Sequence, residues 1–152
     1  MEDMPLDEYI MKIYLSRSVC LDVSANLDQM QEDASRASAS GAELCVFPEG
    51  FLHGYRRHAA PSEIRKRFAA VSGDHPGMAF VFGSFTEDRR NRMTFWQEGR
   101  EKAAYDKVHL FGPNGEFELW EPGSRYPAVK FKEWTLGLMN CNDVRFPEQA
   151  RA

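Results

Sequence analysis

The spacing of apolar residues near the start of the chain predicts an amphipathic helix. From Val23 to Ala37, apolar residues recur at steps of three and four positions, so they share one helical face. Asn26 or Ser24 could cap its start, because either side chain can accept a hydrogen bond from a free backbone amide. Gly41 is expected to end it, since glycine readily adopts the left-handed conformation that follows a helix.

A second amphipathic helix is predicted in the middle of the chain. Ile64, Phe68 and Val71 follow the same spacing. The pattern begins shortly after Pro61 and stops before Gly73. Proline is common in the first turn of a helix and glycine just past its end, so these two residues mark its expected limits.

Short apolar runs bounded by turn residues predict strands before, between and after the helices. Two of these runs flank Glu98-Gly99-Arg100 and are expected to form a hairpin, and a long loop is expected over residues 112–123. Helices and strands alternate at first and strands then follow one another, which predicts an α/β layered sandwich in a single domain over residues 1–152. The strands are expected at residues 11–16, 43–48, 78–85, 93–97, 102–107, 128–131 and 134–141.

Composition limits the kinds of partner and location. With 152 residues, 43% of them hydrophobic and 12% aromatic, the chain is suited to a globular core. Its net charge of −4 comes from interleaved acids and bases, so neither nucleic acid nor a membrane is expected as a partner. No apolar run approaches membrane-spanning length, and the acidic start does not resemble a signal peptide. Three cysteines without close pairs indicate reduced thiols, so a cytoplasmic location is expected.

Three apolar runs end in residues that can take part in catalysis, namely Glu49, Lys107 and Cys141. If residues 134–141 form a buried strand, a sharp turn after it would expose the Cys141 thiol. A helix starting there would favour negative charge on the sulfur, because its N-terminal amides carry partial positive charge. Each residue also has an ordinary structural interpretation. Glu49 could be a solvated loop acid, Lys107 an ion-pair partner at a strand end, and Cys141 an inert packed thiol.

Taken together, the segments around these residues resemble the carbon–nitrogen hydrolase (nitrilase/amidase) superfamily. The matching stretches are Phe-Pro-Glu at 47–49, Tyr-Asp-Lys-Val-His-Leu-Phe at 105–111 and Cys-Asn-Asp-Val-Arg-Phe-Pro-Glu at 141–148. The resemblance covers nearly the whole chain from about Met11. Two departures stand out: Asn142 occupies a position where an aromatic residue often follows the cysteine, and family members continue well beyond this motif, whereas the chain stops at Ala152.

This resemblance implies both a fold and a mechanism. The family fold is a four-layer αββα sandwich with its site at the strand ends, and it would be incomplete in this short chain. Cys141 would attack a carbonyl carbon, while Glu49 would take the thiol proton and return it to the leaving amine. Lys107 and the backbone N–H of Asn142 would stabilise the oxyanion. Such chemistry needs neither a metal nor an organic cofactor.

A second carboxylate often assists in this family, in the loop before a Pro-Gly pair. Alignment back from Pro122 and Gly123 places it at Glu116, with Glu118 as the competitor. The ordinary alternative is an acidic surface turn.

Other residues near these motifs are candidates for lining or supporting the site. Tyr55, Phe51 and Trp120 could form pocket walls, although packing in the core or at an interface explains each of them equally well. Asp143 and Arg145 are expected to brace the turn after Cys141 by ion pairing rather than to touch substrate.

Three functions follow from these observations. The leading hypothesis is a thiol amidohydrolase that acts on a small-molecule substrate, a carboxamide rather than a nitrile, and releases the acid and ammonia. The second is a truncated or partner-dependent subunit that does not catalyse, because ending at Ala152 would leave strand edges and apolar faces uncovered. A homo-oligomer or a separate second-half chain would then cover them. The third, a thiol redox sensor, lacks a second cysteine close to Cys141 in the sequence.

Overall fold

A five-stranded mixed sheet forms the centre of the fold. The computed structural model describes residues 10–17, 22–54 and 61–152. The strands lie across the sheet in chain order; β1, β2 and β3 are parallel, and β3, β4 and β5 are antiparallel. The five strands are β1 (Ile13–Leu15), β2 (Leu44–Val46), β3 (Ala79–Glu87), β4 (Arg90–Gln97) and β5 (Arg100–Asp106).

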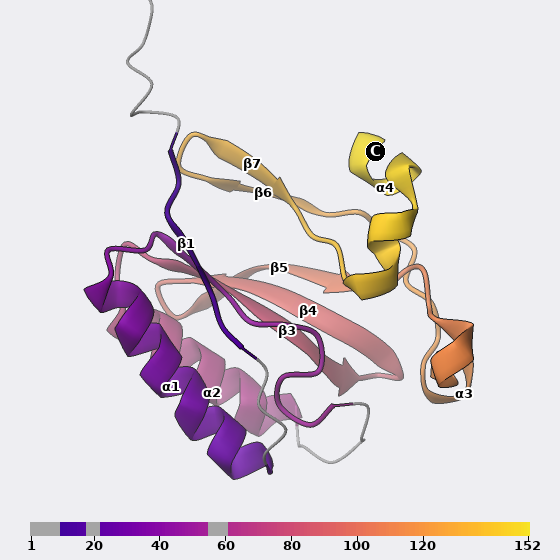
Figure 1. Ribbon diagram of the computed structural model, residues 1–152, viewed down its shortest axis with the longest axis horizontal. Helices are drawn as coiled ribbons and strands as arrows, with labels where there is room; N and C mark the ends of the chain where they lie inside the picture. The colour runs from indigo at the N-terminus through magenta and orange to yellow at the C-terminus, as the bar shows by residue number, and fades with distance from the viewer. Residues whose placement is uncertain (1–9, 18–21, 55–60) are drawn as a thin grey trace, which may run out of the picture.

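Two helices cover one face of this sheet. α1 (Val23–Ala39) and α2 (Pro61–Asp74) lie on the same side of it in Figure 1, and both were predicted from the apolar spacing. Phe68 of α2 stacks on Phe82 of β3, with ring centroids 3.9 Å apart. Every second residue of a strand faces the same side, so Phe80 and Phe82 of β3 share this core, and the irregular pairing between Phe82 and Phe85 lets Phe85 join them. Its buried aromatic members are Phe47, Phe51, Phe68, Phe80, Phe82, Phe85 and Trp96.

The start of α1 differs from the prediction. Asp22 is the N-cap, and its side chain accepts a hydrogen bond from the backbone N–H of Ala25 at 2.9 Å. Asn26 lies inside the helix instead, where it is buried and donates to the carbonyl oxygen of Leu52 at 2.7 Å. The predicted cap was therefore wrong, because the helix begins one turn before Asn26. Gly41 follows the helix end with a φ of 73°, as expected.

Two tight turns join β3, β4 and β5. Glu98 and Gly99 connect β4 to β5 with φ of 52° and 71°, and this hairpin was predicted. Asp88 and Arg89 connect β3 to β4 with φ of 49° and 57°, a turn that the sequence did not indicate. Both turns place two successive residues in the left-handed region, which matches the twist of the flanking strands. Asp-Arg lacks the glycine that usually signals such a turn, so the turn was not expected. β3 and β4 run up to it, to Glu87 and from Arg90.

A two-stranded sheet lies on the opposite face of the large sheet. β6 (Ala128–Phe131) and β7 (Trp134–Gly137) form an antiparallel hairpin, drawn above the large sheet in Figure 1. Val129 and Phe131 of this hairpin belong to a second core with Phe95 and other residues of the large sheet. The described residues thus form a helix layer and two sheet layers, which are three layers of the expected αββα sandwich.

Part of this second face remains exposed at β1. Ile13 pairs with Leu44, which belongs to the second core, so Ile13 and Leu15 point to the same side as the β6–β7 hairpin. They are 49% and 71% exposed, because the hairpin covers the middle of the sheet rather than its β1 edge.

Short helical turns follow β5 and β7. The region after β5 contains η2 (Gly112–Asn114) and α3 (Glu116–Leu119), where the sequence predicted only a loop. β7 ends at Gly137, so the prediction of a strand up to residue 141 was wrong. Its partner β6 begins just after Pro127, which has no N–H, and the pairing ends there. η3 (Cys141–Arg145) and α4 (Pro147–Arg151) complete the chain. Among the helices in the described ranges, none has the length and apolar character needed to span a membrane.

Candidate active site

Glu49 lies in the turn that follows β2, and only 12% of its side chain is exposed. The segment before it lies directly against β3. A side-chain carbon on Gly83 would come within 1.9 Å of the carbonyl oxygen of Pro48, so only glycine allows this approach. The β3–β4 pairing is irregular at the same place, between Phe82 and Phe85. Packing of β3 against this segment therefore determines where the Glu49 carboxylate lies.

Lys107 follows β5 and is fully buried between two carboxylates. Its Nζ donates to Glu49 Oε1 at 2.8 Å and to Glu116 Oε1 at 2.9 Å. Burial lowers the pKa of the ammonium, but the hydrogen bonds and charges of the two carboxylates outweigh it and raise the pKa overall. Lys107 is therefore a cation at neutral pH, held in a fixed position.

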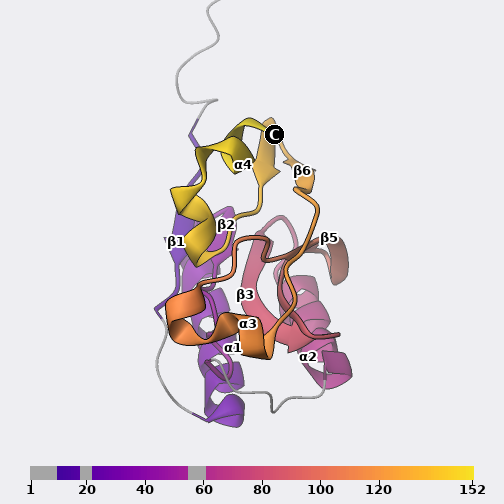
Figure 2. The same ribbon diagram turned by 90° about the vertical axis from the view of Figure 1, so that its right-hand side faces the viewer.

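Glu116 is the predicted second carboxylate that reaches the lysine. It is fully buried at the start of α3, and its Oε2 accepts a hydrogen bond from the backbone N–H of Phe111 at 2.8 Å. Glu118 lies exposed on the same short helix. Figures 1 and 2 show α3 and the C-terminal turns, drawn in yellow, at the same end of the sheet. The structure thus brings Glu116, rather than Glu118, to Lys107.

Cys141 lies at the first position of η3 with a φ of 50°, and its side chain is exposed. The Glu49 carboxylate is the charged group that acts most strongly on the thiol. Partial removal from water and the Glu49 carboxylate raise the pKa of the thiol, although Lys107 acts in the opposite direction. The thiol is consequently protonated at neutral pH, with a carboxylate next to it that can accept its proton.

Asp143 fixes the turn that carries Cys141. Its buried carboxylate accepts hydrogen bonds from the backbone N–H of Asn140 at 2.9 Å and from the Tyr105 hydroxyl at 2.6 Å. The backbone N–H and the Nδ1 of His109 each lie 2.9 Å from its other oxygen. Asp143 therefore braces the turn mainly through hydrogen bonds. Arg145 is exposed and forms no ion pair with any described residue, so the expected ion-pair brace was wrong for this residue.

The remaining predicted residues have separate positions. The side-chain amide of Asn142 donates to the carbonyl oxygens of His109 and Leu110 at 3.1 and 3.3 Å, which ties the turn to the segment after Lys107. Trp120 is buried, and its Nε1 donates to Thr86 Oγ1 at 2.9 Å, so it packs against β3. Tyr55 lies outside the described residues.

The sequence did not identify Asn91 as part of this cluster. Asn91 is buried on β4, and its Nδ2 donates to Glu49 Oε1 at 2.8 Å. Asn140 Nδ2 donates in turn to Asn91 Oδ1 at 3.3 Å. Asn91 lies in a polar stretch between two predicted strands, where the pattern of apolar residues gives no signal for a buried position.

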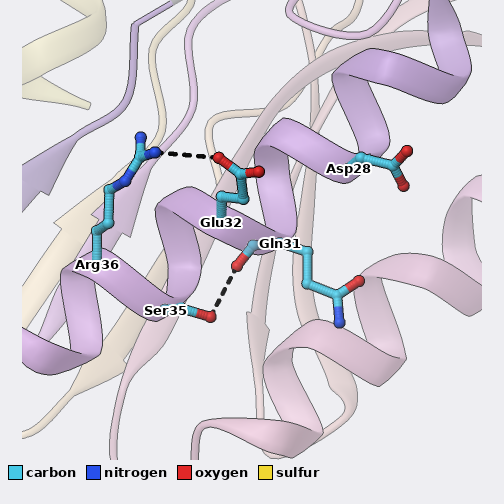
Figure 3. A pocket seen from close by; sticks show the side chains of 5 residues that line it. All are labelled: Asp28, Gln31, Glu32, Ser35 and Arg36. Carbon is cyan, nitrogen blue, oxygen red and sulfur yellow. Dashed lines mark hydrogen bonds and ion pairs between the residues drawn. The ribbon is translucent and has the colours of Figure 1, made fainter.

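Other parts of the surface offer less chemistry. A shallow hollow over α1 is lined by polar residues of that one helix (Figure 3), and none of the clustered residues above lines it. Arg36 and Glu32 form an ion pair there, and Ser35 donates to the carbonyl oxygen of Gln31. Within the described ranges, no group of three or more His, Cys, Asp or Glu side chains is placed to hold a metal ion.

Comparison with known proteins identifies relatives of this chain. Residues 11–152 match the carbon–nitrogen hydrolase family. The protein named "Hydrolase in pqqF 5′ region" of Pseudomonas protegens is 30% identical over 145 residues, which cover 86% of this chain and 50% of that protein. The omega-amidase YafV of Escherichia coli K12 is 28% identical over 140 residues, which cover 88% of this chain and 54% of the amidase.

Solved structures lead to the same group of proteins. The amidase from Nesterenkonia sp. AN1 has a TM-score of 0.81 and 30% identity, covering 93% of this chain and 61% of that one. Another structure of the amidase, a glutamate-to-glutamine variant, shows the Michael addition of acrylamide at its active-site cysteine. The match confirms the α/β class that the sequence predicted. The present chain spans about half to three fifths of the length of these relatives.

Proposed function

Because this chain belongs to the carbon–nitrogen hydrolase family, we propose that it hydrolyses a small carboxamide to the corresponding acid and ammonia. The observation that carries this proposal is the position of the Glu49 carboxylate. It accepts a hydrogen bond from Lys107 Nζ at 2.8 Å, and its charge raises the pKa of the Cys141 thiol. A thiol, a carboxylate and an ammonium group held together supply the nucleophile, the base and the oxyanion partner that hydrolysis through a thioester needs.

The reaction begins with a neutral thiol. Since the pKa of Cys141 is raised, the sulfur keeps its proton until a substrate carbonyl is in place. Glu49 then accepts this proton while the sulfur forms a bond to the carbonyl carbon. The electron pair of the carbonyl double bond moves onto the oxygen and makes an oxyanion.

Lys107 and the backbone N–H of Asn142 stabilise that oxyanion. One well-placed donor of this kind contributes about 3 kcal/mol to the transition state. Glu116 contacts Lys107 Nζ at 2.9 Å and raises the pKa of the lysine, so it keeps this ammonium charged and in position.

Collapse of the oxyanion breaks the carbon–nitrogen bond. Glu49 gives its proton to the departing nitrogen, which leaves as ammonia, and a Cys141 thioester remains. A water molecule then attacks the thioester, and Glu49 takes one of its protons. The carbon–sulfur bond breaks, the sulfur regains a proton, and the acid is released.

A carboxamide is favoured over a nitrile as the substrate. The relatives support this choice, because an omega-amidase and an amidase are among them. The chain is proposed to share their class of substrate, a small amide.

Ammonia release from a panel of small amides and nitriles tests the proposal. We expect wild-type protein to release ammonia from an amide, Cys141→Ala to release none, and Lys107→Ala to be at least about a hundredfold slower. Cys45→Ala is the matched control. Cys45 is a buried thiol in the helix-side core, so its loss should change the rate of ammonia release only as far as it lowers the fraction of folded protein.

Two results would contradict the proposal. One is folded wild-type protein that hydrolyses no member of the panel. The other is a Cys141→Ala variant that keeps the wild-type rate, since the activity would then come from another site or another protein.

A further inference from the structure

Asn91 lies among the three residues that carry the proposed chemistry. Its side chain is 1% exposed. Nδ2 donates to Glu49 Oε1 at 2.8 Å, and Oδ1 accepts from Asn140 Nδ2 at 3.3 Å. The backbone N–H of Lys107 donates to the carbonyl oxygen of Asn91 at 2.9 Å. Asn91 therefore contacts Glu49, Lys107 and the residue directly before Cys141.

These contacts leave the Asn91 amide one satisfactory orientation. The Glu49 carboxylate can only accept hydrogen bonds, so Nδ2 must face it. Asn140 Nδ2 can only donate, so Oδ1 must face that side. A rotated amide would place an acceptor against an acceptor and a donor against a donor, at a buried site where such mismatches are costly.

The amide also restricts the Glu49 carboxylate. Oε1 accepts one hydrogen bond from Lys107 Nζ and one from Asn91 Nδ2, each at 2.8 Å. Two donors at these distances use both lone pairs of that oxygen. A thiol beside this carboxylate would therefore meet it at Oε2.

We propose that Asn91 is a positioning residue, which holds Oε1 of Glu49 so that Oε2 faces the Cys141 thiol. The inference deepens the proposed function and rests on it. Asn91 acts through Glu49, and it touches neither the substrate nor the reacting sulfur in this reaction. Its nitrogen also draws negative charge away from the carboxylate that raises the thiol pKa.

A double-mutant cycle on the alkylation of Cys141 tests this role without any amide substrate. Asn91→Leu keeps the branching and the number of side-chain heavy atoms and removes both side-chain hydrogen bonds. More negative charge then remains on Glu49 beside the thiol, so alkylation by iodoacetamide at pH 7 should slow by about threefold or more, with the pH profile moved to higher pH. In a Glu49→Gln background, the same substitution should change the rate by less than about twofold, because its effect passes through the carboxylate.

A second variant and a matched control make the cycle decisive. Asn91→Ala leaves room for water and should give the same result, slower alkylation in the wild-type background and little change in the Glu49→Gln background. It replaces Asn91→Leu in the cycle if that variant does not fold. Ser72→Ala is the control, because it also removes two hydrogen bonds of a buried side chain, at the other end of the β4–β5 hairpin. Ser72 Oγ accepts from the backbone N–H of Gly99 at 3.1 Å and donates to the carbonyl oxygen of Ala69 at 3.3 Å. This substitution should leave both the rate and the pH profile unchanged.

Equal effects of the Asn91 substitutions in both backgrounds, or no effect in either, would overturn the positioning role. An equal slowing in Ser72→Ala would also overturn it, since the effect would then reflect general loosening. Failure of the proposed function is a separate result. It would appear as wild-type protein without amide hydrolysis, whatever the cycle shows.

Discussion

Opposing charges act on the Cys141 thiol. Partial removal from water and the Glu49 carboxylate raise its pKa, Lys107 lowers it, and the raising effects prevail. The sequence suggested that helix amides would favour a thiolate, but η3 is a short turn, and the charge that acts most strongly on the thiol is that of Glu49. In the proposed reaction, proton transfer to Glu49 therefore activates the sulfur, rather than a thiolate formed beforehand.

Glu49→Gln is expected to change two properties of Cys141 in opposite directions. Without the carboxylate charge, Lys107 lowers the thiol pKa unopposed by Glu49, so alkylation by iodoacetamide at pH 7 should become about threefold faster or more. Amide hydrolysis should become at least about a hundredfold slower, because the proton acceptor is lost. Peptide mass spectrometry measures the first rate and ammonia release measures the second.

Glu63→Gln provides the control for Glu49→Gln. Glu63 lies on α2 and pairs with Lys66 at an exposed position, so its loss should alter neither rate. Slower alkylation in Glu49→Gln would show that the carboxylate does not raise the thiol pKa, and unchanged hydrolysis would remove Glu49 from the mechanism.

The sequence indicated Glu49 and Lys107 but not Asn91, because a local pattern shows strand ends and not contacts between distant strands. Glu49 and Lys107 each come directly after an apolar run that forms a strand, so the pattern of apolar residues places them at strand ends. Asn91 is recognisable only through its partners, Glu49 and Asn140, which lie 42 and 49 positions away. Such contacts depend on strand pairing that a local pattern does not contain. The catalytic roles of Glu49, Lys107, Glu116 and Cys141 stay predictions.

At the scale of elements, close approaches of backbone segments decide where the side chains lie. Gly83 allows β3 to pack against the segment before Glu49. Gly123 has the same function near Lys107, because an added side-chain carbon would come within 2.1 Å of the carbonyl oxygen of Asp106. The backbone N–H of Gly123 donates to the carbonyl oxygen of Lys107 at 2.9 Å, which ties the later loop to the lysine.

Gly83→Ala should therefore displace the Glu49 segment. A methyl group at this position would overlap the carbonyl oxygen of Pro48, and the backbone would have to shift, at a cost of about 1–3 kcal/mol in the free energy of unfolding. Thermal melting measures the loss, and alkylation of Cys141 reports the moved carboxylate.

Gly137→Ala is the matched substitution for Gly83→Ala. Gly137 also lies in a strand, but nothing lies within 4 Å of the added carbon. We expect little change in either measurement for this variant. Equal melting temperatures for the two variants would show that β3 can adjust without moving the Glu49 segment.

Element types were predicted better than element limits. The apolar spacing indicated α1 and α2 because their faces pack on one sheet. The turn at Asp88 and Arg89 was missed because its left-handed conformation is imposed by the pairing of long strands rather than by glycine or asparagine. Similarly, Asp22 caps α1 because the helix starts at Val23, the first residue of the apolar pattern, and not after Ser24 or Asn26.

At the scale of the molecule, the two faces of the large sheet differ in how completely they are covered. α1 and α2 cover one face, whereas the β6–β7 hairpin leaves Leu15 of β1 71% exposed on the other. Exposed apolar residues at a sheet edge favour association with another surface. The sequence predicted a homo-oligomer or a second polypeptide chain, and that expectation stays a prediction.

Leu15→Lys should reduce self-association if this face joins two copies of the chain. A charge on the exposed apolar face opposes its burial against another copy. Light scattering over a range of protein concentrations measures the average mass. Gln31→Lys adds the same charge on the exposed face of α1 and should leave the mass unchanged. An equal decrease in both variants would indicate a general effect of charge instead.

The Asp143 carboxylate joins two stretches of backbone that are far apart in the sequence. It accepts from the N–H of Asn140 and from the N–H of His109, so one side chain protects an amide on each side of the site. These two amides should exchange with solvent deuterium through a common opening event, with similar protection factors that fall together in Asp143→Ala. The turn that carries Cys141 and the segment after Lys107 would then open and close as one cooperative unit.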